Sequence, residues 1–129
     1  MDIQHQPEDE ENNRARKKAL NEVILGEEAK IIFEELEAKA KKFKAERMLL
    51  KGILQKAEIL KIEAHYGNPI AKHLIPWEYR MKNDANHLFR LELPLFWRMP
   101  YTITSEREGE SKIVILDILN HKDYDKKFG

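Results

Sequence analysis

The sequence predicts an α+β domain in which an N-terminal strand and a helical hairpin pack on a small antiparallel sheet. Two observations predict it: apolar and polar residues alternate from His87 to Asn120, and two helical patterns precede this region. A period of two is typical of strands with one face on a core, whereas apolar residues three to four positions apart indicate amphipathic helices. We therefore expect residues 20–129 to form a single domain.

The composition limits the classes of function. The 129 residues include 23 Lys and Arg against 23 Asp and Glu, so the formal net charge is zero. Such a chain has no overall attraction to nucleic acid or membrane, and any nucleic-acid site must be a local patch. The absence of cysteine excludes disulfides and thiolate chemistry. Without a signal-peptide pattern or an apolar run near the ~20 residues of a membrane span, we expect a cytoplasmic protein with no membrane contact.

The N-terminal half predicts an arm, a strand and two helices. Residues 1–19 contain almost nothing apolar, so they are expected to form a flexible arm. Leu20–Leu25 is typical of a short strand, and apolar stripes predict helices over Glu27–Phe43 and Ala45–Ala64. Gly52 within the second helix costs about 1 kcal/mol against Ala, which close packing would explain.

The C-terminal half predicts a three-stranded meander. The turn residues Gly67–Pro69 and the segment 71–79, which contains Pro76, are expected to be an irregular connector. Pro100 lacks a backbone donor, which favours an edge position or a bulge. Alternation then divides the side chains between a face under the helices, with Phe89, Leu91, Met99 and Tyr101, and an open face, with Arg90 and Arg98; His121 and Lys122 follow at the end of the sheet.

Three segments, taken in order, resemble the RelE/ParE toxin superfamily. HYGNPIAKHL resembles the linker between its helical hairpin and its sheet, LFRLELPLFWRMPYTI resembles its "(Y/F)R(L/V)…YR(V/L)(L/I)Y" signature, and ILDILNHKDYDK resembles its closing "…I.HRK..Y". The resemblance extends from Leu20 to Tyr124 and implies a RelE-like fold.

The resemblance also implies a function. RelE-like members are endoribonucleases that cut mRNA, commonly on the ribosome, whereas ParE-like members inhibit DNA gyrase. An antitoxin protein neutralises both kinds. The implied ribonuclease reaction uses no metal and no cofactor: the ribose 2′-hydroxyl attacks the adjacent phosphate, which requires proton transfer and fixed positive charge. The alternative is a non-catalytic binding module on the same fold, either a gyrase inhibitor or an interaction protein, so whether the chain is an enzyme stays open.

Six residues are candidates for the site that the resemblance implies. Arg98 matches the arginine of the "YR" element and would stabilise charge on the phosphate, while His121 would transfer protons. The other candidates are Lys122, which stands for the arginine of the "HR" pair, the C-terminal tyrosine Tyr124, and two RNA-binding residues, Arg90 and Lys112.

Each candidate also has a structural explanation. Arg98 is equally consistent with a surface salt bridge to Glu92 across the hairpin, and Arg90 is more consistent with a salt bridge at the rim of the sheet. His121 is equally consistent with a cap at the end of a strand, and Tyr124 with packing. The carboxylates of Glu92 and Asp117 are expected on or near the open face, where they would repel RNA phosphates. His65, His73 and His87 lack the spacing of a zinc site, so no metal is expected.

Overall fold

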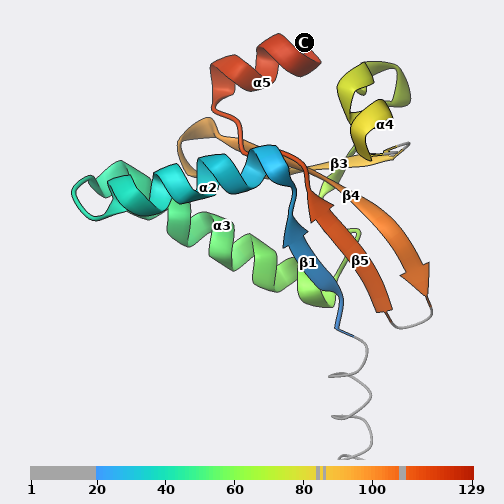
Figure 1. The fold of residues 1–129 in the computed structure, drawn as a ribbon, viewed down its shortest axis with the longest axis horizontal. Helices are drawn as coiled ribbons and strands as arrows, with labels where there is room; N and C mark the ends of the chain where they lie inside the picture. Colours follow the sequence, from blue (N-terminus) through green and yellow to red (C-terminus); the bar gives the residue numbers. More distant parts are fainter. Residues whose placement is uncertain (1–19, 84, 86, 108–109) are drawn as a thin grey trace, which may run out of the picture.

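The computed structural model describes residues 20–83, 85, 87–107 and 110–129, so the expected arm, residues 1–19, lies outside the described residues. The described chain has an α+β fold (Figure 1). Its elements are β1 (Glu22–Leu25), α2 (Glu27–Ala40), α3 (Lys44–Ile62), β2 (Asn68–Ile70), α4 (Trp77–Asn83), β3 (Leu88–Glu92), β4 (Arg98–Arg107), β5 (Glu110–Ile115) and α5 (His121–Phe128), with short 3-10 turns at Lys72–Leu74 and Pro94–Phe96.

The sheet differs from the expected meander in two ways. It has five strands in the order β1-β5-β4-β3-β2, and β1 runs parallel to β5, so the sheet is mixed rather than antiparallel. The second difference is β2, which forms where a turn was expected and pairs with β3. Proline has no backbone N–H to donate to a neighbouring strand. Pro69 is therefore tolerated in β2, because this strand lies at the edge of the sheet and pairs on one side only.

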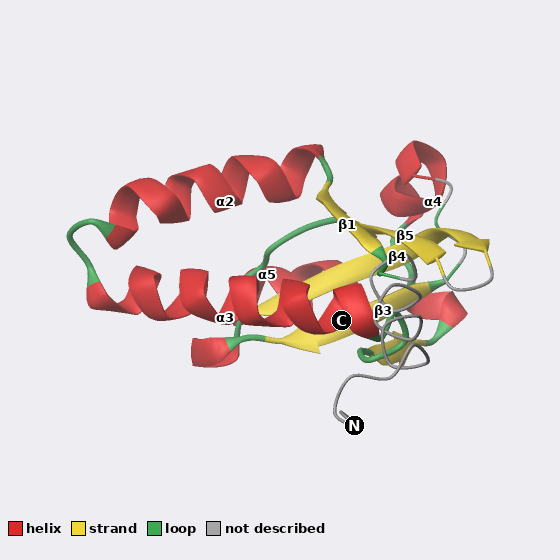
Figure 2. Cartoon of the chain, turned by 90° about the horizontal axis from the view of Figure 1, so that it is seen from below, coloured by secondary structure: helices red, strands yellow, loops and turns green. Residues whose placement is uncertain are grey.

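The helical hairpin forms as expected, and both helices begin and end within a few residues of the predicted positions. The carboxylates of Glu27 and Glu28 lie in the first turn of α2, where the helix dipole favours negative charge. Figure 2 shows α2 and α3 lying side by side, with α3 in front of the strands of the sheet. Gly52 of α3 packs on the turn between β3 and β4, since a Cβ atom there would lie 2.6 Å from Cδ of Pro94.

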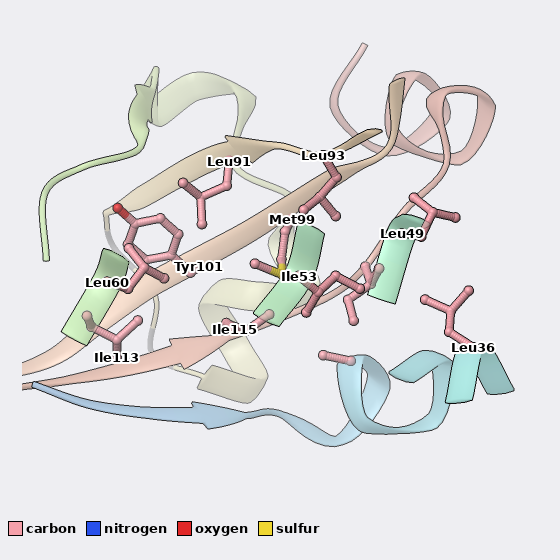
Figure 3. Packing of buried hydrophobic residues seen from close by; sticks show 12 residues of the cluster. Leu36, Leu49, Ile53, Leu60, Leu91, Leu93, Met99, Tyr101, Ile113 and Ile115 are labelled. Atoms are coloured by element: carbon pink, nitrogen blue, oxygen red, sulfur yellow. The ribbon is translucent and has the colours of Figure 1, made fainter. Parts of the chain in front are cut away.

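The main core lies between this hairpin and one face of the sheet. Figure 3 shows side chains from both helices pointing toward the side chains of β3, β4 and β5. Met99 and Tyr101 are fully buried there, and Leu91 and Ile53 are 2% exposed. Because a shift of one residue would exchange the two faces, this burial confirms the predicted register.

The opposite face of the sheet is not open, which corrects the prediction. A second cluster covers part of it, formed by Tyr79 of α4, Tyr124 and Phe128 of α5, and apolar residues of the sheet such as Leu88. Helix α4 occupies part of the connector that was expected to be irregular, and α5 occupies the predicted end of the last strand. His121 and Lys122 are therefore the first residues of a helix rather than the end of a strand.

An extra residue in the chain after β5 lies beside Pro100. The expected edge position of Pro100 is wrong, because β4 is the central strand. The Leu116 N–H donates to the Pro100 carbonyl, yet Arg98 pairs with Leu119, so Asp117 and Ile118 together oppose one residue of β4. Two residues opposing one is the pattern of a β-bulge, but it lies in the segment after β5 and not at Pro100 itself. It places Asp117 in the interior, 4% exposed, away from the surface that was expected for it.

Candidate functional site

Three elements bring four of the six candidate residues together. Arg90 comes from β3, Arg98 from β4, and His121 and Tyr124 from α5. The β3–β4 register places Glu92 opposite Arg98 and Pro100 opposite Arg90, so both arginines share the face on which α5 packs. These four residues therefore form one cluster only because α5 packs on this face of the sheet.

Tyr124 is the centre of this cluster. Its ring is 7% exposed, and the guanidinium carbons of Arg90 and Arg98 lie 5.7 and 5.2 Å from the ring centroid. Both distances are within the range of cation–π attraction. Arg90 Nη1 also donates to the Tyr124 hydroxyl at 3.5 Å, and this contact raises the pKa of Arg90 above its ordinary value. The aromatic ring thus holds two permanent positive charges next to each other.

Glu92 pairs with both arginines. Its carboxylate oxygens lie 2.9 Å from Arg90 Nε and 3.0 Å from Arg98 Nε, which includes the cross-hairpin pair expected as a structural explanation for Arg98. The two Nε–H groups are buried, yet neither is aimed well enough at the carboxylate to form a hydrogen bond. These contacts are therefore ion pairs without directional bonds, and the Glu92 side chain is 48% exposed. An anion in the position of this carboxylate would face two guanidinium groups.

His121 lies at the start of α5, next to Arg98. Its Nδ1 is 3.4 Å from Arg98 Nη1, and its Nε2 is 3.2 Å from Asp125 Oδ2 one turn later. A guanidinium only donates, so Nδ1 accepts in this contact and the proton of a neutral imidazole stays on Nε2, facing Asp125. The Asp125 carboxylate thereby orients the ring, as acidic partners of histidines commonly do. The lone pair of Nδ1 points toward the arginine cluster.

The other two candidates are not part of this cluster. Lys122 is exposed on the second residue of α5. Lys112 lies near the start of β5, at the end of the strand remote from α5, and its ammonium is 3.8 Å from Glu22 of β1. The structure thus brings Arg90, Arg98, His121 and Tyr124 together, and places Lys112 elsewhere on the sheet.

Sequence reasoning missed the role of α5 and of the β3–β4 turn. The signals for α5 are present in the sequence: Asn120 caps the helix by accepting from the Asp123 N–H at 2.8 Å, and Lys126 and Lys127 follow in the last turn. These signals predict a helix start at Asn120, and the spacing of Tyr124 and Phe128 gives it one apolar face.

The β3–β4 turn presents an exposed aromatic ring beside the site. Leu95 and Phe96 have φ values of 61° and 64°, a left-handed conformation that costs roughly 1–2 kcal/mol for each residue with a side chain. The Phe96 ring is 73% exposed and lies 6.3 Å from the His121 ring, while the Phe96 carbonyl accepts from Arg98 Nη1 at 2.9 Å. Exposed aromatic rings beside arginines are typical of platforms on which bases stack.

The geometry is suited to binding an anion and moving a proton. Two guanidinium groups provide fixed charge for a phosphate, and the oriented imidazole of His121 provides a proton acceptor next to them. Among the described residues, no group of three His, Asp or Glu side chains is arranged to hold a metal ion. None of the described helices combines the length and the apolar character needed to cross a bilayer.

Comparison with known proteins gives no assignment: no protein-family model, no curated protein and no solved structure matches this chain.

Proposed function

We propose that this protein is a RelE-like toxin that cleaves mRNA without a metal and is neutralised by an antitoxin. The single observation that carries the proposal is the convergence of Arg90 and Arg98 on the ring of Tyr124, with His121 3.4 Å from Arg98. These residues were selected from the sequence resemblance, and they come from three elements that are distant in the chain. The order of strand, helical hairpin and sheet supports the proposed RelE-like fold.

The roles follow from the chemistry of each side chain. Arg98, with a side chain only 17% exposed, binds the scissile phosphate and stabilises the negative charge that accumulates on it. Arg90 adds a second positive charge near the Tyr124 ring. His121 accepts the proton of the attacking 2′-hydroxyl through Nδ1 once Arg98 Nη1 turns from this nitrogen to the phosphate, and Asp125 stabilises the imidazolium that forms. As the O2′–P bond forms, the P–O5′ bond breaks and the leaving 5′-oxygen takes a proton from water. Phe96 provides a stacking surface for a base beside the cleaved bond.

A second function is favoured by Glu92. Its carboxylate already pairs with both arginines, and a phosphate that enters must displace it or share the cluster with it. This observation favours the non-catalytic module, in which the same fold binds a protein partner such as a topoisomerase. The two functions differ in one measurable property, which is cleavage of RNA.

Cleavage of mRNA after induced expression tests the proposal, measured in cells and on translating ribosomes. Arg98→Ala should reduce the cleavage rate about a hundred- to a thousandfold, because one preorganised donor contributes about 2.7–4 kcal/mol to transition-state stabilisation. Arg98→Lys should restore only part of the activity, since an ammonium group lacks the planar fork of the guanidinium.

Arg80→Ala is the matched control, because Arg80 is an exposed arginine of α4 that donates to the Lys72 carbonyl outside the cluster. This variant should cleave at the wild-type rate, with circular dichroism confirming that all variants are folded. A wild-type protein that neither arrests growth nor cuts RNA in either setting would replace the ribonuclease by the binding module.

A further inference from the structure

A cavity of about 300 Å³ adjoins the arginine cluster on the side of β2. Its wall is formed by Pro69, Ile70, Ala71 and Leu74, from β2 and the turn that follows it. The opposite side is formed by Arg90 and by residues of α5 that include Tyr124 and Asp125. Arg90 and Tyr124 therefore belong both to the cluster and to this cavity, so the cavity directly adjoins the cluster.

The lining of the cavity has the chemistry of a nucleobase site. The wall from β2 is apolar, so it suits a flat ring better than a charged group. The carboxylate of Asp125 would repel a second phosphate, but it accepts hydrogen bonds from exocyclic amino groups of bases. The Arg90 guanidinium adds a planar cation on which a base can stack. A volume near the lower limit of small-molecule pockets is sufficient for one base.

We propose that this cavity binds the base of the nucleotide whose phosphate contacts Arg90 and Arg98. Bases with an exocyclic amino group, adenine, guanine and cytosine, bind more tightly than uracil, because Asp125 accepts from that amino group. The inference rests on the proposed ribonuclease function for the identity of the ligand as RNA. The cavity and its lining do not depend on whether the bond is cut.

Binding of single nucleotides tests the cavity separately from cleavage. The probes are 2′-deoxyadenosine 3′-monophosphate, 2′-deoxyuridine 3′-monophosphate and inorganic phosphate, and the readout is the NMR signals of the Ala71 and Leu74 methyl groups together with the side chains of Arg98 and His121. Phosphate should shift only the Arg98 and His121 signals. The adenine nucleotide should shift the two methyl signals as well, and the uracil nucleotide should bind about two- to tenfold more weakly, the value of one hydrogen bond.

Blocking the cavity provides the second measurement. Leu74→Trp places a large ring against the cavity from a side chain that is 43% exposed and lies outside the catalytic cluster. It should raise the KM for an RNA oligonucleotide at least tenfold. The matched control is Leu54→Trp, since Leu54 is a leucine of α3 with a similar exposure of 52% that lines a different hollow. This control should leave KM unchanged.

The possible results separate the cavity from the ribonuclease function. A nucleotide that shifts no more signals than phosphate does would overturn the base site. RNA cleavage with the same KM in Leu74→Trp and wild type would also overturn it, while the ribonuclease function stands. Methyl shifts with adenine nucleotide but no RNA cleavage would support the base site and overturn the ribonuclease function. No shift with any probe, phosphate included, would overturn both.

Discussion

At the scale of single residues, the proposed RNA site depends on a competition between Glu92 and an incoming phosphate for the two arginines. The Glu92 carboxylate neutralises part of the charge of two arginines, and it lies where a phosphate would make its closest contacts. The sequence alone suggested that this carboxylate repels RNA from an open face. The structure gives it a second effect, because the same ion pairs hold both guanidinium groups near the Tyr124 ring.

Glu92→Gln should therefore strengthen the binding of RNA. The amide keeps the size of the side chain but removes its negative charge, so the arginines gain capacity for phosphate. Partly exposed ion pairs contribute up to about 1 kcal/mol each, so the loss of both pairs predicts an affinity up to about thirtyfold higher for an RNA analogue without a 2′-hydroxyl at the cleavage position. Fluorescence anisotropy at constant salt measures this affinity.

Glu58→Gln is the control for that measurement. Glu58 pairs with Lys61 at 2.8 Å on α3, remote from the cluster, and its side chain is 70% exposed. This variant makes the same change of net charge, so it should leave the affinity at the wild-type value. Weaker or unchanged binding in Glu92→Gln would show that the carboxylate acts mainly by holding the arginines in position.

At the scale of elements, the contact between α3 and the β3–β4 turn positions the site. Gly52→Ala brings two opposite effects: alanine improves the helix by about 1 kcal/mol, while overpacking costs about 1–3 kcal/mol. The added Cβ would lie 2.6 Å from Cδ of Pro94, whose ring cannot rotate away. We expect overpacking to dominate and the free energy of unfolding in urea to fall by about 1 kcal/mol.

The background variant Pro94→Ala separates the two effects. Without the proline ring, Gly52→Ala should become stabilising, because only the helix term remains. The same loss of stability in both backgrounds would contradict the explanation and would place the close contact elsewhere.

The elements that the sequence predicted well have long patterns. Helices α2 and α3 repeat their apolar residues over 14 and 19 residues, and β4 alternates over a strand of 10, so their faces and register follow from periodicity. The elements it missed are β2, α4 and α5, with 3, 7 and 8 residues. Elements this short contain too few residues to show a clear periodic pattern. Packing against the rest of the protein therefore determines whether they form a helix or a strand.

The same limit applies to the site. Motif resemblance placed Arg98, His121 and Tyr124 in one group, and strand alternation placed Arg90 on the same face as Arg98. Neither indicated that α5 folds back onto that face and brings the Tyr124 ring within cation–π distance of both arginines. Asp125 became a partner of His121 only because both lie on one side of a helix, where residues four apart are neighbours.

At the scale of the whole molecule, the site depends on a buried polar group that ties α4 and α5 to the sheet. Asp117 accepts from the Tyr79 hydroxyl at 3.0 Å, from Lys127 Nζ at 3.2 Å and from the Ile118 N–H at 3.0 Å. A buried carboxylate is retained only when it is paired in this way. Because Tyr79 belongs to α4 and Lys127 to α5, Asp117 connects the two helices that cover the face of the arginine cluster.

On the other face, a second buried tyrosine links the hairpin to the sheet. The Tyr101 hydroxyl donates to the Ala64 carbonyl at 2.8 Å and accepts from the Gly67 N–H at 2.9 Å. Burial raises the pKa of Tyr101 to about 12, and burial together with the nearby Asp117 carboxylate also raises the pKa of Tyr79. Both tyrosines therefore favour the neutral form in the folded protein.

These two pKa values predict a loss of stability at alkaline pH. Tyrosines of the unfolded chain lose their protons near pH 10, whereas Tyr101 keeps its proton up to about pH 12. The folded state then binds more protons than the unfolded state, so the free energy of unfolding falls as the pH rises from 10 to 12. Two pKa units correspond to a loss of about 2.7 kcal/mol from Tyr101, with a further loss from Tyr79.

Tyr101→Phe should be less stable than wild type at pH 8, because the Gly67 N–H and the Ala64 carbonyl lose their partner, yet it should lose less stability between pH 10 and 12. Urea unfolding at pH 8, 10 and 12 measures both effects, and Tyr79→Phe should flatten the same pH dependence independently. If both variants lose stability as steeply as wild type, other groups govern alkaline unfolding and the two buried hydroxyls do not.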